Sequence, residues 1–97
     1  MNESELKWSQ EGFEIQVDAH QLARFANQVM IGHDPESFEL RFLYIAPGTR
    51  QGVLVAHIIL TPPHAKRLLA ALQDNIQKYE STFGPIPEQI LPMGPTA

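Results

Sequence analysis

Residues 61–87 constrain the fold more than any other part of the chain, because they predict one long amphipathic helix with both ends marked. Thr61 suits the N-cap, and Pro62 and Pro63 fit the first helical turn, where a missing N–H has no intrahelical partner. Gly84 suits the C-terminal end, and the prolines after it stop the helix. At about 100° per residue the apolar positions form one stripe. Its members are Ala65, Leu68, Leu69, Leu72, Ile76, Tyr79 and Phe83.

The segments before this helix read as strands. Residues 13–17 alternate between apolar and polar with the period of two that is typical of a half-buried strand. Residues 25–33, 38–45 and 53–60 follow, separated by a turn at 34–37 and a loop at 47–52 that contain proline. The sequence therefore predicts an α+β fold: an antiparallel β-meander of three to four strands, followed by one long amphipathic helix packed on one sheet face.

The chain is short enough to predict a single domain. Its 97 residues suggest a mobile leader at 1–11, an α+β domain at 12–84 and a Pro-rich tail at 85–97. A domain of this size is marginally stable by itself and usually adds a disulfide, a metal or a partner subunit. The chain has no cysteine, so disulfides and thiolate metal sites are excluded. A good core, a partner, or both must supply the stability.

Turn lengths predict the register of the sheet. If His33 pairs with Phe38, and Ile45 pairs with Val53, both hairpins place the same residues on one face. We call this the first face, and we expect it to receive the helix stripe. It contains Val29, Ile31, Phe38, Leu40, Phe42, Tyr44, Leu54, Ile58 and Leu60.

The opposite, second face is also largely apolar, although a solvated face should be mostly polar. One helix cannot cover both faces, and an apolar patch of this kind usually marks a binding site. We expect a homodimer in which a second copy covers it, since symmetric homo-oligomers are common. The alternative is that the first strand, Trp8 or the C-terminal tail folds back over it. The candidate dimer face contains Met30, Arg41, Leu43, Ile45, Val53, Val55, His57 and Ile59.

His57 interrupts an otherwise apolar strand, and the predicted register places Arg41 directly opposite. Two cations in that position are unfavourable unless His57 is neutral or Glu39 pairs with it. The residue is then either a neutral interface histidine or a pH-sensitive one, since histidine titrates near neutrality. The four histidines have no HxH or helical i, i+4 spacing. No metal, cofactor or catalytic residue is predicted, and a nucleophile motif is absent from the sequence.

His64, Lys66 and Arg67 crowd the start of the helix, where cations oppose the helix dipole. A bound phosphate or carboxylate would relieve this, so the three are a candidate anion contact. However, the two prolines remove backbone donors that such a site uses. The alternative is an ordinary solvated face. The net charge of −4 and the pI near 5.4 argue against nucleic acid as a partner.

The sequence predicts a cytoplasmic protein. Its first residues are polar and acidic and do not form a secretory signal. The longest apolar stretch, residues 53–60, is far too short to span a bilayer, so no membrane partner is expected.

Several segments resemble one small bacterial and archaeal family, the domain of unknown function 3467. They lie at 25–29 (FANQV), 38–42 (FELRF), 58–69 (IILTPPHAKRLL), 72–76 (LQDNI) and 79–84 (YESTFG), and the likeness covers about residues 13–86. The helix segment is the most specific part. The family usually has Asp at the position of Arg41 and Arg at the position of His57, so a cross-strand ion pair of the family is replaced here. The resemblance implies no function.

Three functions remain open from the sequence. The first is a homodimeric protein-interaction module without catalytic activity, with itself and an unidentified protein as partners. The second is an accessory nucleic-acid or anion-binding protein that uses His64, Lys66 and Arg67. The third is a small hydrolase or isomerase with His57 as the general base, which one histidine alone supports.

Overall fold

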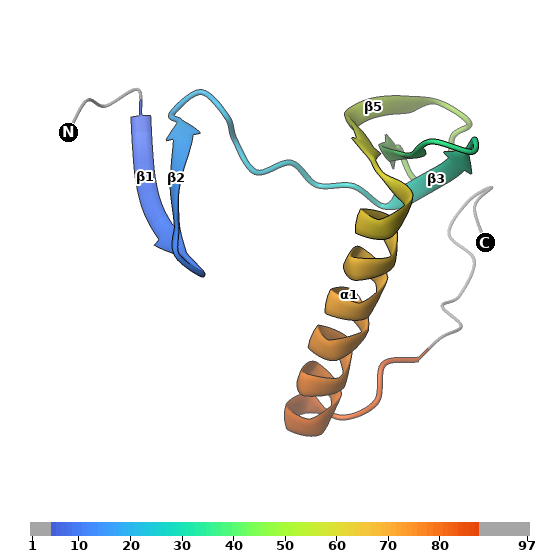
Figure 1. Cartoon of the computed structure of the whole chain (residues 1–97). Helices are drawn as coiled ribbons and strands as arrows, with labels where there is room; N and C mark the ends of the chain where they lie inside the picture. The colour runs from blue at the N-terminus through green and yellow to red at the C-terminus, as the bar shows by residue number, and fades with distance from the viewer. Residues whose placement is uncertain (1–4, 88–97) are drawn as a thin grey trace.

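The computed structural model describes residues 5–87, and the predicted tail beyond residue 87 lies outside them. The chain is an α+β fold with five strands in two antiparallel sheets and one long helix (Figure 1). This confirms the predicted fold class. The elements are β1 (Glu5–Gln10), β2 (Phe13–Asp18), β3 (Gln28–His33), β4 (Phe38–Ile45), β5 (Gly52–Leu60) and α1 (Pro62–Phe83).

β1 and β2 form a hairpin of their own, where the sequence predicted a mobile leader up to residue 11. Its two-residue loop is Glu11–Gly12, and both residues have positive φ, at 52° and 84°. A type I′ turn requires this, and it usually contains Asn-Gly or Asp-Gly. This turn has Glu at its first position, so the sequence did not predict it. The hairpin stands apart from the rest of the chain, at the end of a linker at 19–27 (Figure 1).

β3, β4 and β5 form the second sheet with β4 in the centre. The predicted register of β3 on β4 is confirmed, with His33 opposite Phe38. On β5 it is confirmed from Phe38 to Phe42, but the predicted pairing of Ile45 with Val53 is wrong. The register shifts by one residue after Phe42 at a β-bulge. The extra residue lies on β5, which has nine residues where β4 has eight. Beyond the bulge Tyr44 lies opposite Val53.

Asn27 extends the β3–β4 ladder by one step beyond the strand. Its side-chain amide nitrogen donates to the carbonyl oxygen of Ile45, and its amide oxygen accepts from the backbone nitrogen of Ile45, both at 2.9 Å. Its own backbone nitrogen donates to the carbonyl of Leu43. The side chain therefore takes the place of a peptide group, and it fixes where the linker leaves the sheet.

The boundaries predicted for α1 are confirmed. Thr61 occupies the N-cap position without a side-chain hydrogen bond, and its carbonyl accepts from the backbone nitrogen of Ala65. At the other end Gly84 has φ 95°, a conformation that glycine adopts readily, and its N–H donates to the carbonyl of Glu80. α1 packs on the first face with its first turns, and the remaining turns lead away from the sheet (Figure 1).

The core of the described chain is very small, and Leu40 on β4 is the one apolar side chain counted as buried there, at 8% exposure. The chain exposes 8659 Å², whereas a folded monomer of its mass exposes about 5,600 Å². Its radius of gyration is 16.7 Å, against about 12.5 Å for a compact domain of 97 residues. Exposed apolar side chains include Phe13, Phe25, Ile31, Val53, Ile59, Leu69, Leu72 and Phe83.

Candidate interaction surfaces

The second face of the β3–β4–β5 sheet has no element over it among the described residues. Its central row places Met30, Arg41 and His57 side by side, and Ile59 lies opposite Glu39 in the next row. Leu43 and Ile45 share this face, with Leu54 opposite Leu43. Six of the eight residues of the predicted dimer face therefore lie on it.

The bulge removes the other two residues, Val53 and Val55, from the second face, and it puts Leu54 there, so the predicted place of Leu54 on the first face is wrong. Val53 lies opposite Tyr44, on the first face. Val55 lines a hollow together with Phe42 and Ala56, which are also first-face residues. The sequence missed this because one inserted residue reverses the alternation of every residue beyond it.

Three polar side chains form a cluster in the centre of the second face. One carboxylate oxygen of Glu39 (Oε1) lies 2.8 Å from Nε2 of His57 and accepts from the Arg41 guanidinium at 3.2 Å. Arg41 and His57 lie opposite each other, as predicted, and Glu39 contacts both. The three side chains are between 35% and 41% exposed, so water weakens these pairs. They satisfy one another without a ligand.

The first face opens into a groove beside α1, which we call the helix–sheet groove. It has a volume of about 480 Å³ and an almost wholly apolar lining. The sheet and the first turns of the helix supply its walls, which are formed by Leu40, Phe42, Ile58, Leu60, His64, Arg67, Leu68 and Ala71. The groove exists because α1 diverges from the sheet and leaves the apolar residues of both unfilled.

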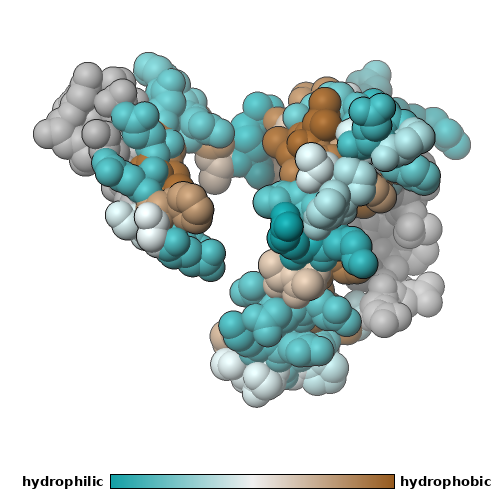
Figure 2. Space-filling view, viewed as in Figure 1, coloured by the Kyte–Doolittle hydropathy of each residue, from teal (hydrophilic) through white to brown (hydrophobic). Residues whose placement is uncertain are grey.

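The stripe of α1 is open along the rest of its length. On the other side of the helix start, Phe38, Ala65 and Leu69 line a second hollow with Lys66 and the two prolines. Further along, only helix residues line the surface around Leu72. The rings of Tyr79 and Phe83 contact each other at a tilt of 44°, with ring centroids 4.9 Å apart. Figure 2 shows apolar surface on the hairpin and around the sheet in one view.

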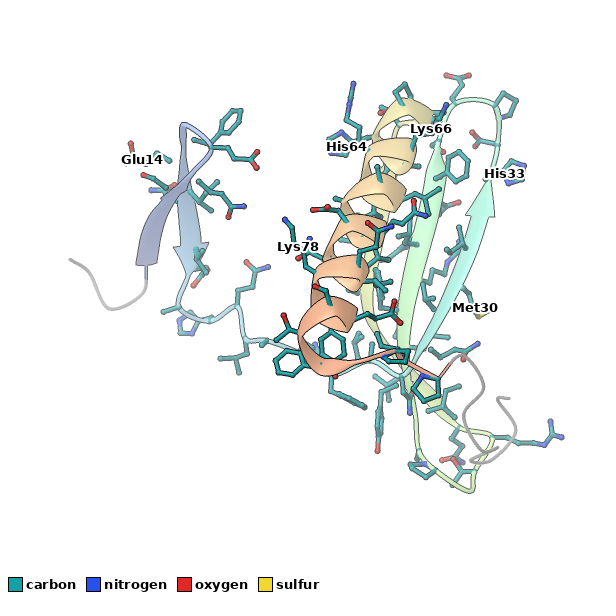
Figure 3. The ribbon with its side chains drawn as sticks, turned by 90° about the horizontal axis from the view of Figure 1, so that it is seen from below. Glu14, Met30, His33, His64, Lys66 and Lys78 are labelled. Atoms are coloured by element: carbon teal, nitrogen blue, oxygen red, sulfur yellow. The ribbon has the colours of Figure 1, made fainter. Side chains whose placement is uncertain are left out.

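The structure does not bring the candidate anion contact together. The Arg67 guanidinium donates to Nδ1 of His64 at 3.2 Å, and both line the helix–sheet groove. Lys66 lines the hollow on the other side of α1. In Figure 3 the side chains of His64 and Lys66 lie on different sides of the helix. Arg67 makes the rim of the groove basic and Lys66 lies away from it, so the three residues do not form a phosphate cradle.

The remaining histidines lie far apart. His20 is in the linker and His33 stacks on Phe38, with ring centroids 5.5 Å apart. Next to His33, hydrogen bonds from the backbone of Glu36 and then of Ser37 hold the pKa of Asp34 below its ordinary value. That carboxylate shapes the β3–β4 turn. Within residues 5–87 no three His, Asp or Glu side chains are grouped to hold a metal ion.

Comparison with known proteins gives one match. The model of the family described as "Protein of unknown function (DUF3467)" matches residues 1–88. No curated protein and no solved structure matches the chain. In the part of the chain that the structure describes, α1 is too polar to be a membrane-crossing helix.

Proposed function

The chain belongs to the DUF3467 family of proteins of unknown function, and we propose that it is a homodimeric protein-interaction module without catalytic activity. One observation carries this proposal: among the described residues, Leu40 alone is a buried apolar side chain. A domain stable by about 5–15 kcal/mol must bury much more apolar surface than that. The chain has no disulfide, and a second subunit would supply this burial.

The exposed area is large enough for such a partner. The chain exposes about 3,000 Å² more than a folded monomer of its mass. A stable interface buries about 800 Å² on each partner, so the excess accommodates a full dimer interface. A second copy is the partner that is always present, and the commonest assembly of soluble proteins is a two-fold symmetric homodimer.

We place the second copy on the helix side of the sheet. There the first face, the helix–sheet groove and the stripe of α1 form one apolar surface, with Ile31, Leu69 and Leu72 more than half exposed. The second face is the smaller contact in this proposal, because Glu39, Arg41 and His57 occupy its centre and already pair with one another. Interfaces are typically depleted in charged residues at their core.

Ile59→Glu tests the second face. Ile59 is 64% exposed and lies beside the polar cluster. We expect this variant to keep the dimer mass and to change the dissociation constant by less than about tenfold, or 1.4 kcal/mol. Size-exclusion chromatography with light scattering measures both the mass and its concentration dependence.

The matched control is Ile59→Ala, which removes the apolar surface without adding a charge. Conversion of Ile59→Glu to a single-chain species, with Ile59→Ala still dimeric, would show that the second face carries the dimer. The face predicted from the sequence would then replace the helix side in this proposal.

The absence of catalysis and of nucleic-acid binding remains part of the proposal. The polar groups on the second face satisfy one another, and His57 has Glu39 as its partner rather than a nucleophile. The basic residues of α1 are split between its two sides, and the chain is acidic overall. Nucleic-acid binding needs a basic surface that follows the phosphates.

A further inference from the structure

We infer that the β1–β2 hairpin of each copy covers the helix–sheet groove of the other copy. This inference rests on the proposed homodimer. It names the β1–β2 hairpin as the element that the two copies exchange. It also assigns a ligand to the basic rim of the groove: the carboxylate of Glu11 in the turn of the partner's hairpin. Three observations carry it, namely the unpartnered hairpin, the linker and the charges.

The hairpin has an apolar side, on which Phe13 is 68% exposed. Phe13, Ile15 and Val17 share one side of β2, and the residues between them are polar. Their partners in register on β1 are Gln10, Trp8 and Leu6. An isolated two-stranded hairpin is at best marginally stable in water. The hairpin therefore needs an apolar surface, and it stands away from the sheet and helix of its own chain (Figure 1).

The linker is suited to an exchanged element. It has nine residues, at 19–27, and therefore spans at most about 30 Å. Its sheet end is fixed by the hydrogen bonds of Asn27, and Phe25 packs edge-on against Tyr44. Leu22 and Phe25 are nevertheless each 72% exposed, although the linker lines a hollow with Phe42, Val55 and Ala56 of the sheet. Exchange of an identical element between copies is a low-cost route to a dimer.

The charges of the two surfaces are complementary. The hairpin, residues 5–18, contains four acidic residues and one basic residue, Lys7, and of the acids Glu11 lies in the turn. α1 has no acidic residue in its first turn, and His64 and Arg67 form the rim of the groove. A carboxylate at that rim offsets the unfavourable position of cations at a helix N-terminus. The lining of the groove is almost wholly apolar, which suits the apolar side of the hairpin.

Cross-linking between differently labelled chains tests the exchange, because the chain has no cysteine of its own. Chains with Ile15→Cys, labelled with heavy nitrogen, are unfolded together with unlabelled Leu68→Cys chains and refolded as a mixture. A short bifunctional thiol reagent then links neighbouring cysteines. We expect a product of one heavy and one light chain, joined between positions 15 and 68, in severalfold excess over the product with the matched control Gln16→Cys.

The possible failures are distinct. If the double variant Ile15→Cys, Leu68→Cys forms the link within one chain at high dilution, the hairpin covers its own groove and the exchange is wrong. If the mixed chains form no more product than the control while light scattering still gives a dimer, the hairpin does not cover the groove, and the homodimer stands. A monomer at all concentrations would instead overturn the proposed function.

Discussion

Leu72→Glu is expected to convert the protein into a single-chain species. Leu72 lies in the middle of the apolar stripe and is 55% exposed in the isolated chain. Burial of its remaining surface in a dimer contributes about 1.5 kcal/mol per copy, and a symmetric dimer contains the residue twice. The loss of about 3 kcal/mol raises the dissociation constant about 100-fold, before any cost of burying the new carboxylate. Light scattering on a dilution series measures this change.

Ala70→Glu is the matched control, because it adds the same charge on the polar side of the same helix. Glutamate is a good helix former, so neither variant disturbs α1 by propensity. We expect the control to keep the mass of the unmodified protein. Circular dichroism shows in addition whether the Leu72→Glu chain stays folded, since many obligate homodimers have no stable folded monomer. A Leu72→Glu variant with an unchanged dimer mass would contradict the helix-side interface.

Leu40→Ala is expected to have the largest effect on stability. Leu40 lies on the central strand, between Ile31 and Ile58, and forms part of the floor of the helix–sheet groove. Removal of a buried leucine side chain costs about 2–5 kcal/mol. For a domain of this size each kcal/mol lowers the melting temperature by about 4–8 °C. A fall of more than about 10 °C is therefore expected at fixed protein concentration.

Leu54→Ala is the control for that experiment. It removes the same atoms from β5, on the second face, where Leu54 is half exposed. We expect Leu54→Ala to lower the melting temperature by well under half as much as Leu40→Ala does. Equal effects of the two changes in thermal unfolding would mean that Leu54 is buried as deeply as Leu40 in the assembled protein. The second copy would then lie on the second face.

The parts of the fold that depend on local chemistry could be predicted from the sequence. The ends of α1 follow from Pro62 and Gly84, whose backbone preferences act within one turn. The β3–β4 register follows from the short turn at Asp34, whose carboxylate accepts from the backbone nitrogens of Glu36 and Ser37. The contact between Glu39 and His57 was one of the two alternatives that the register left open.

The features of the fold that the sequence did not predict depend on more than one segment or on an unusual residue. The Glu11–Gly12 turn has an unusual first residue, so the hairpin was interpreted as a leader. The bulge adds one residue to β5 without any break in its apolar pattern, and it moves Val53 and Val55 to the first face. The angle of α1 to the sheet is set by what fills the space between them. In the described residues of one chain, that space is the open groove.

The most direct test of the central claim is the solution mass of the unmodified protein, measured by light scattering over a wide range of concentrations. The account predicts a stable species of twice the 10.9 kDa chain mass, which dissociates only at high dilution and loses its fold as it does so. A folded species of 10.9 kDa at every concentration would contradict it. Such a result would mean that the chain covers its own apolar surfaces, and both the homodimer and the exchanged hairpin would be wrong.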